Sequence, residues 1–157
     1  MLASAKKLFT ICDSRDIVQT KQLFLIEKAM LYIHEKQFSK VTPLLYDCLD
    51  LLQKDPQPLG TYYLDVGEYF QAIGNYNGAE RAYKLLRKRM NADPIMSAGF
   101  RYKGEIHLAQ LYYRMREYEK SREVLTRVYP KIQKDRNCDS TTKTLAESLI
   151  PLLAQVK

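Results

Sequence analysis

The chain has 157 residues and a formal net charge of +7, from 25 Lys and Arg against 18 Asp and Glu. Apolar residues make up 46% of the chain, which excludes a disordered protein and is enough for a hydrophobic core. No apolar run approaches the roughly 20 residues of a membrane-spanning helix, so neither a transmembrane segment nor a membrane partner is expected.

Apolar residues recur with helical spacing along the whole chain, and no segment alternates as a strand would. The sequence therefore predicts an all-α fold. The first predicted helix covers 2–13, and the Asp-containing break after it offers caps for the second. The remaining predicted helices cover 17–35, 38–53, 58–73, 76–91, 95–115, 118–134 and 141–156.

The breaks between these helices contain capping and turn residues. Gly74-Asn75 is typical of a left-handed cap at the end of a helix. Asp139 is placed to cap the last helix. Two prolines fall inside predicted helices: Pro130 is expected to end or bend its helix, and Pro151 to disturb the final turns of the last one.

Three segments, 29–41, 67–79 and 109–121, align without gaps. Each begins with a small residue, followed by an aromatic three residues later and a second aromatic six beyond that. A small or β-branched residue comes three further on, and an apolar one four after it. These positions are Ala29, Tyr32, Phe38, Val41 and Leu45, then Gly67, Phe70, Tyr76, Ala79 and Tyr83, then Ala109, Tyr112, Tyr118, Ser121 and Leu125.

This pattern resembles the tetratricopeptide repeat, whose small residues let the two helices of a hairpin approach closely. The middle copy matches best. The copies are 38 and 42 residues apart, longer than the family's usual period of about 34, which would lengthen helices or loops. The outer copies have Lys36 and Arg116 where the middle one has Gly74. The alternative is a helical bundle without a repeat.

The resemblance implies one domain over 1–157, with antiparallel hairpins stacked as a short right-handed α-solenoid of about three repeats. Flanking helices would protect its ends. The predicted parts are an N-terminal helix at 1–16, repeats at 17–54, 58–92 and 95–135, and a C-terminal capping helix at 140–157.

In proteins of this family the first helices of the hairpins line a concave groove that holds a partner protein or peptide. In the first repeat the corresponding stripe is Leu23, Ile26, Met30 and Ile33, and the second repeat begins with Thr61. The candidate partner-binding residues are Leu64, Glu68, Gln71, Lys103, Ile106, Gln110, Tyr113 and Arg114. The resemblance therefore implies a non-enzymatic scaffold or adaptor, a subunit of a larger assembly.

The two ends of this stripe differ in chemistry. The apolar beginning would anchor an amphipathic helix of a partner, or would be covered by residues 2–13 of the chain itself. The basic end, with Lys103 and Arg114, suits a carboxylate or an acidic side chain. The predicted partner is thus a protein or peptide, and an acidic one at the basic end.

Basic residues are concentrated in 81–136, with fifteen bases against six acids, whereas 57–80 holds three acids and no base. Such a segment could bind nucleic acid, so an RNA-binding helical-repeat module is the first alternative function. No RNA- or DNA-binding motif accompanies the bases, which favours a protein partner. A peptide-sensing regulatory module is the second alternative.

The sequence contains no recognisable catalytic or metal-binding constellation. Its two histidines, His34 and His107, are not spaced as metal ligands with cysteines or carboxylates. Cys12, Cys48 and Cys138 are too far apart for a disulfide framework and are expected to be reduced thiols in an intracellular compartment, the cytoplasm. We therefore expect no enzymatic activity, no cofactor and no metal.

Overall fold

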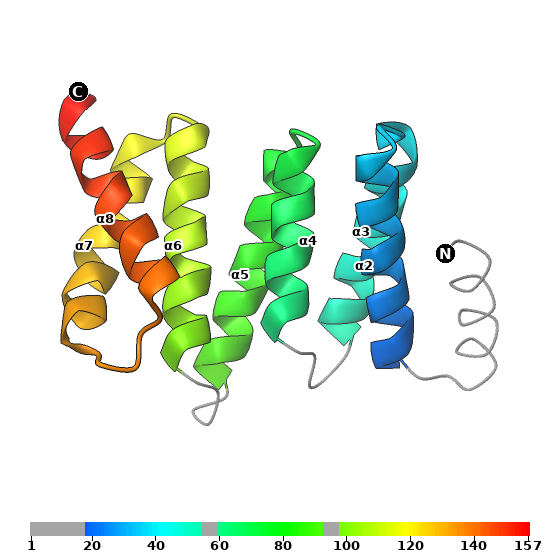
Figure 1. Cartoon of the computed structure of the whole chain (residues 1–157), viewed down its shortest axis with the longest axis horizontal. Helices are drawn as coiled ribbons and strands as arrows, with labels where there is room; N and C mark the ends of the chain where they lie inside the picture. The colour runs from blue at the N-terminus through cyan, green and yellow to red at the C-terminus, as the bar shows by residue number, and fades with distance from the viewer. Residues whose placement is uncertain (1–17, 55–59, 93–97) are drawn as a thin grey trace. The chain divides into compact units, whose positions relative to one another are not determined.

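The computed structural model describes residues 18–54, 60–92 and 98–157, and every regular element within these ranges is an α-helix (Figure 1). The all-α fold class is therefore confirmed for these residues. The predicted helix over 2–13 lies outside them. The helices are α2 (Val18–His34), α3 (Phe38–Lys54), α4 (Gly60–Ala72), α5 (Tyr76–Ala92), α6 (Ala98–Arg114), α7 (Tyr118–Lys134) and α8 (Ser140–Gln155).

Prolines do not end the helices that contain them. Pro130 lies inside α7, which continues to Lys134, and Pro151 lies inside α8, which continues to Gln155. The prediction that Pro130 could end its helix is wrong. Both prolines are solvent-exposed, as are the residues four positions earlier, so water can satisfy the carbonyl that proline leaves without an N–H partner.

The chain divides into two compact units, which we call the N-terminal unit (Met1–Ala82) and the C-terminal unit (Tyr83–Lys157). The division falls inside α5. The N-terminal unit therefore contains α2, α3, α4 and the first turns of α5, and the C-terminal unit contains the rest of α5 with α6, α7 and α8. The single domain and the stacking into a solenoid remain predictions.

In the N-terminal unit, α2 and α3 form a hairpin and α4 packs against both (Figure 1). The side-chain amide of Gln22 donates to the carbonyl of Cys48 at 3.2 Å and joins the hairpin. The hydroxyl of Tyr63 in α4 donates to the carbonyl of Leu52 at 3.5 Å. Both donors are buried, so these bonds satisfy polar groups that would otherwise destabilise the core.

The small residues of the repeated pattern lie where helices meet. Ala29, Ala79 and Ala109 are all fully buried. In the third copy the position of Ala79 is taken by Ser121, whose hydroxyl donates to the carbonyl of Ala109 at 2.7 Å. A larger side chain at these positions would push the two helices of a hairpin apart.

The turns that close the hairpins have the same backbone conformation in all three copies. Gly74, Lys36 and Arg116 have positive φ angles of 77°, 58° and 62°. In each turn the N–H of this residue bonds to the carbonyl three positions earlier, and the next N–H bonds to the carbonyl five positions earlier. This is the hydrogen-bond pattern of a Schellman cap. The three aligned segments therefore share the backbone conformation of this turn, whereas their membership of a tetratricopeptide repeat remains a prediction.

In the C-terminal unit, α6 and α7 form a hairpin and α8 packs against both. Asp139 caps α8, as predicted, by accepting from the backbone N–H of Thr142 at 3.1 Å. At the other end of α8, the guanidinium of Arg122 donates to the carbonyls of Leu153, at 2.9 Å, and Val156. Arg122 thus satisfies carbonyls that have no partner within the helix.

Gly78→Ala should destabilise the fold. A Cβ at this position would lie 2.5 Å from the ring of Phe70, which is fully buried and has little room to move. The clash should outweigh the gain in helix propensity of about 1 kcal/mol and leave a net loss of roughly 1–2 kcal/mol. Urea unfolding measures it. Asn77→Ala, at the exposed neighbouring position, is the control and should not lower stability; an equal loss in both would contradict the account.

Arg116→Gly should stabilise the fold. Its φ of 62° is costly for a residue with a Cβ, whereas glycine adopts it freely. The gain should be roughly 0.5–1 kcal/mol after the larger backbone entropy of glycine in the unfolded chain is subtracted. Lys131→Gly, inside α7, is the control and should lose a similar amount. Thermal unfolding checks the two signs, and a loss for both variants would rule out the strained turn.

Candidate partner-binding faces

Two of the predicted groove residues belong to the core. Leu64 is 6% exposed and Ile106 is fully buried. The prediction that they line a groove is therefore wrong, because both point toward neighbouring helices. The exposed positions of α4 and α6 lie beside them: Glu68 and Arg114 are exposed, and the remaining predicted residues are half-buried, namely Gln71, Lys103, Gln110 and Tyr113.

The apolar stripe predicted on α2 is also divided. Ile26 is buried and Ile33 half-buried, whereas Leu23 and Met30 are 45% and 46% exposed. Glu27 lies between the exposed pair, four residues after Leu23 and three before Met30, and so shares their helix face. Residues 2–13 lie outside the described residues, so their packing on this face remains a prediction.

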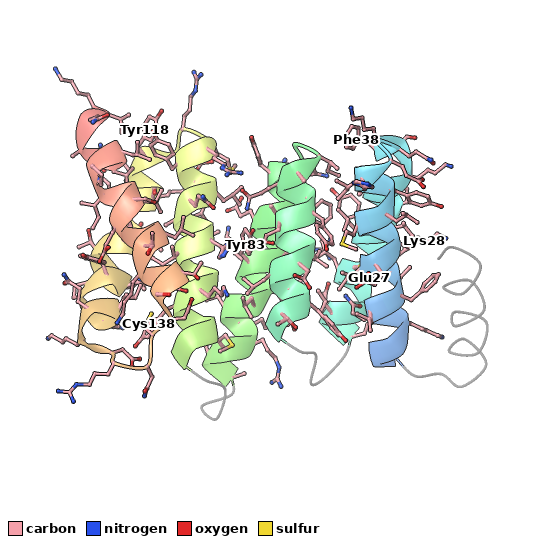
Figure 2. The ribbon with its side chains drawn as sticks, in the orientation of Figure 1. Glu27, Lys28, Phe38, Tyr83, Tyr118 and Cys138 are labelled. Carbon is pink, nitrogen blue, oxygen red and sulfur yellow. The ribbon has the colours of Figure 1, made fainter. Side chains whose placement is uncertain are left out.

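In the N-terminal unit, carboxylates and tyrosines of α2 and α4 come together. Burial and the nearby Glu27 carboxylate raise the pKa of Asp65 above its usual 3.8. Burial, followed by the charges of Asp65, Glu27 and Glu68, raises the pKa of Tyr69. Figure 2 shows Glu27 on the side of α2 toward α4 and Lys28 on the other side. The stripe read from the sequence missed Glu27 and Asp65, each of which directly follows a core residue.

The cations predicted at the basic end lie on one stripe of α6 but are not adjacent. Lys103 and Arg114 are eleven residues apart, about 16 Å along a helix. Lys103 lies near Asp139: although partial burial raises the pKa of that carboxyl, hydrogen bonds from Thr142 and the charge of Lys103 bring it below the usual 3.8. One small carboxylate therefore cannot bridge Lys103 and Arg114, and only an extended segment could contact both.

Tyr113 lies at the end of α6 against the first residue of α7. Its ring is 5.5 Å from that of Tyr118, centroid to centroid, with an angle of 54° between the ring planes. Tyr118 is the second aromatic of the repeated pattern. The two rings therefore pack together across the hairpin turn and form a half-buried aromatic surface next to Arg114.

His107 lies on the same stripe of α6, but its side chain packs against another side chain of the protein. Its ring is 5.7 Å from that of Tyr83, centroid to centroid. Burial and the charges of Lys103 and Arg114 lower the pKa of His107 from the usual 6.5 to about 4. It is therefore neutral at physiological pH and packs against the tyrosine.

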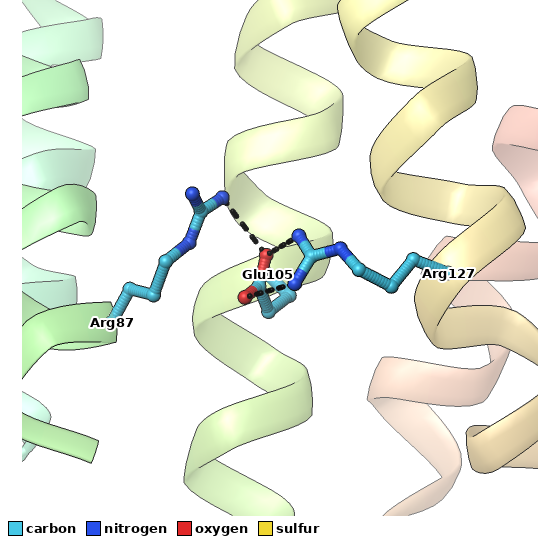
Figure 3. Close-up of polar contacts among 3 residues, drawn as sticks. All are labelled: Arg87, Glu105 and Arg127. Carbon is cyan, nitrogen blue, oxygen red and sulfur yellow. Dashed lines mark hydrogen bonds and ion pairs between the residues drawn. The ribbon is translucent and has the colours of Figure 1, made fainter. Parts of the chain in front are cut away.

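Glu105 joins three helices of the C-terminal unit (Figure 3). Its side chain is 8% exposed and accepts from Arg87 of α5 at 3.0 Å and from Arg127 of α7 at 2.9 and 3.3 Å. A buried carboxylate is costly unless it is paired and hydrogen-bonded, and the two guanidinium groups supply both conditions. In the sequence it stands out only as an isolated acid within a basic segment.

The described residues offer little for catalysis. They contain no group of three or more His, Cys, Asp or Glu side chains placed to hold a metal ion. Burial and the neighbouring Asp47 raise the pKa of Cys48 from 9.0 to about 12, and burial also raises that of Cys138. Neither thiol is therefore activated as a nucleophile. Across 18–54, 60–92 and 98–157, no helix has the length and apolar character to cross a membrane.

Comparison with known proteins identifies a similar fold but no family. No protein family model matches the chain, and no curated protein sequence does. The crystal structure of BtubC (BKLC) from P. vanneervenii is similar, with a TM-score of 0.70 and 16% sequence identity. The match covers 96% of this chain and 61% of BtubC, so this chain spans less than two thirds of that protein's length. At this identity the likeness shows the helical fold alone.

Stability should fall in mild acid because of His107. The unfolded chain protonates this residue near its usual pKa of 6.5, whereas the folded chain keeps it neutral down to about 4. Its contribution is therefore fully present above pH 6.5 and is lost as the pH falls toward 4, by up to about 3 kcal/mol. Urea unfolding from pH 7 to 4 should give a flatter profile for His107→Gln. The control His34→Gln, at an exposed position, should keep the wild-type slope; a wild-type slope in His107→Gln would contradict the assignment.

Glu105→Gln should destabilise the C-terminal unit. It keeps the shape of the side chain but leaves two arginines without their counter-charge. Removing one partner of a buried ion pair costs several kcal/mol, but Arg87 and Arg127 are 32% and 47% exposed, which reduces the expected loss to roughly 1–3 kcal/mol. Chemical denaturation measures it. Glu123→Gln, an exposed acid on α7, should change stability by less than about 0.5 kcal/mol.

Proposed function

We propose that this chain is a non-enzymatic scaffold or adaptor of the tetratricopeptide type, which binds a partner protein or peptide through the first helices of its hairpins. The observation that carries the proposal is the hairpin turn at Lys36, Gly74 and Arg116, repeated with the same positive φ and the same hydrogen bonds. Repeated helical hairpins cannot each bury a complete core, and they expose an extended face suited to another chain.

The exposed parts of these first helices are chemically mixed. On α6 one stripe contains the half-buried Lys103 and Gln110 and the exposed Arg114, beside the half-buried ring of Tyr113. Arginine and tyrosine are enriched at protein interfaces, because each combines a large contact area with polar groups that bond a partner. The stripe extends over about 16 Å, so it suits an extended acidic segment rather than a single carboxylate.

The arrangement of the basic residues supports a protein partner over nucleic acid. Several bases of 81–136 make contacts within the protein: Arg87 and Arg127 bind Glu105, and Arg122 binds Glu119 and the end of α8. Binding to phosphates needs cations that are free to face the backbone of the nucleic acid. Basic residues that already bind other helices of the protein therefore contribute little to a phosphate-binding surface.

An absence of catalysis is part of the same proposal. Of the two histidines, His107 packs against Tyr83 and is kept neutral, and His34 is exposed at the end of α2. Among the residues that the structure describes, neither the histidines nor the thiols of Cys48 and Cys138 are therefore arranged as a nucleophile with its base.

Affinity capture from native lysate tests the proposal, with and without nuclease and at two salt concentrations. We expect a discrete protein that survives nuclease treatment and is lost with the Lys103→Glu/Arg114→Glu variant. Like charges placed opposite an acidic segment should weaken its binding at least about tenfold. Lys131→Glu/Lys134→Glu, which makes the same change of charge on exposed positions of α7, is the control and should retain the partner.

Two results would contradict this proposal. Recovery of nucleic acid alone, lost at the higher salt concentration, would favour the RNA-binding alternative. Equal loss of the partner in both charge-reversal variants would show that only net charge matters and that the α6 stripe is not the binding surface.

A further inference from the structure

The N-terminal unit has a second exposed face, of opposite charge to the α6 stripe. We name it the acidic α2–α4 face and define it by Leu23, Glu27 and Met30 of α2 with Asp65 and Tyr69 of α4. We propose that this face binds a lysine- or arginine-bearing amphipathic segment of a partner protein. This inference rests on the proposed scaffold function and adds a second surface, with its own partner chemistry.

The face is formed by two helices that contact each other within one unit. Leu23, Glu27 and Met30 are spaced by four and three residues and so lie along one side of α2. The charge of Glu27 acts on both Asp65 and Tyr69, which are four residues apart on α4. The two helices also pack against each other, which brings Glu27 close to the carboxylate and the tyrosine of α4.

Apolar side chains supply the area on which a helix could dock. Leu23 and Met30 are 45% and 46% exposed, about one helical turn to either side of Glu27. A complementary amphipathic helix would carry two apolar anchors about seven residues apart with a cation between them. The anchors would contact the exposed apolar pair on α2, and the cation would face the carboxylate of Glu27. Methionine adapts its shape readily to a partner's side chains.

Charge complementarity determines the partner. Among the described residues, the charges that raise the pKa values of Tyr62, Asp65 and Tyr69 are those of the carboxylates Glu27, Asp65 and Glu68, and burial also raises each of these pKa values. Residues 57–80 contain no Lys or Arg. On α2, Lys28 is directed to the rings of Phe24 and Tyr32, on the side away from Glu27. A cation from a partner would relieve the repulsion between Glu27 and Asp65 and gain the tyrosine rings as neighbours.

Binding of defined peptides to the full chain tests this inference by fluorescence polarisation. The probe is a synthetic amphipathic helical peptide with leucines at positions i and i+7 and lysines between and beside them. The comparison peptide has glutamate at every lysine position. We expect the lysine peptide to bind and the glutamate peptide to bind at least about tenfold more weakly. Failure of the lysine peptide to bind, or equal binding of both peptides, would overturn the proposal.

Variants locate the binding site. Glu27→Lys/Asp65→Lys should weaken the lysine peptide at least about tenfold and strengthen the glutamate peptide. Glu123→Lys/Glu147→Lys makes the same change of net charge on exposed positions of the C-terminal unit and should change neither affinity by more than about twofold. Leu23→Ser/Met30→Ser should weaken both peptides, because it removes the apolar anchors. Circular dichroism and thermal unfolding of each variant separate lost binding from lost folding.

The chain's own N-terminal segment is the competing occupant, since Lys6 and Lys7 lie among apolar residues there. A full chain with Leu8→Ser/Phe9→Ser distinguishes the two. Unchanged affinity for the lysine peptide supports a separate partner, and binding that appears only in this variant would contradict it. The peptide experiments do not involve the stripe on α6, so their outcome does not change whether an acidic partner is captured there. Failure of this inference can therefore be distinguished from failure of the proposed function.

Discussion

The close approach of paired helices is the constraint on which the rest of the structure depends. Ala29, Ala79 and Ala109 are fully buried where helices meet, and a left-handed residue closes each hairpin with the same two hydrogen bonds. With the helices held this closely, a residue's position along its helix decides whether it is buried or exposed. The exposed faces of α2, α4 and α6 are therefore fixed by core packing.

Polar contacts refine this arrangement inside each unit. In the C-terminal unit Glu105 binds arginines of α5 and α7, while Arg122 and Asp139 satisfy opposite ends of α8. Such contacts specify how neighbouring helices are paired more than they add stability, since desolvation offsets much of a buried ion pair's attraction. Some of the basic residues that the sequence concentrates between 81 and 136 are therefore already paired within the protein. The stripe on α6 is still basic, whereas the acidic α2–α4 face is of opposite charge.

The sequence predicted the helices well and the exposed faces less well, for a physical reason. Periodicity places helix boundaries within a few residues, and Asp139 and Gly74 were recognisable as caps. The register of the exposed stripe depends on which neighbour each side packs against, and a one-residue shift rotates a side chain by about 100°. Because the predicted stripe was out of register by one residue at these points, it included the core residues Leu64 and Ile106 and omitted Glu27 and Asp65. The prediction that Pro130 could end its helix was wrong because helix propensity does not include the water that can satisfy an exposed carbonyl.

Cross-linking of the full chain to its captured partner, read by mass spectrometry with lysine- and carboxylate-reactive reagents, tests the central claim most directly. If the first helices of the hairpins form the binding surface, the cross-links should fall on them, at residues such as Lys103 on α6 and Asp65 and Glu68 on α4. Cross-links confined to the second helices, through Lys84, Lys131 and Lys134 of α5 and α7, would contradict it.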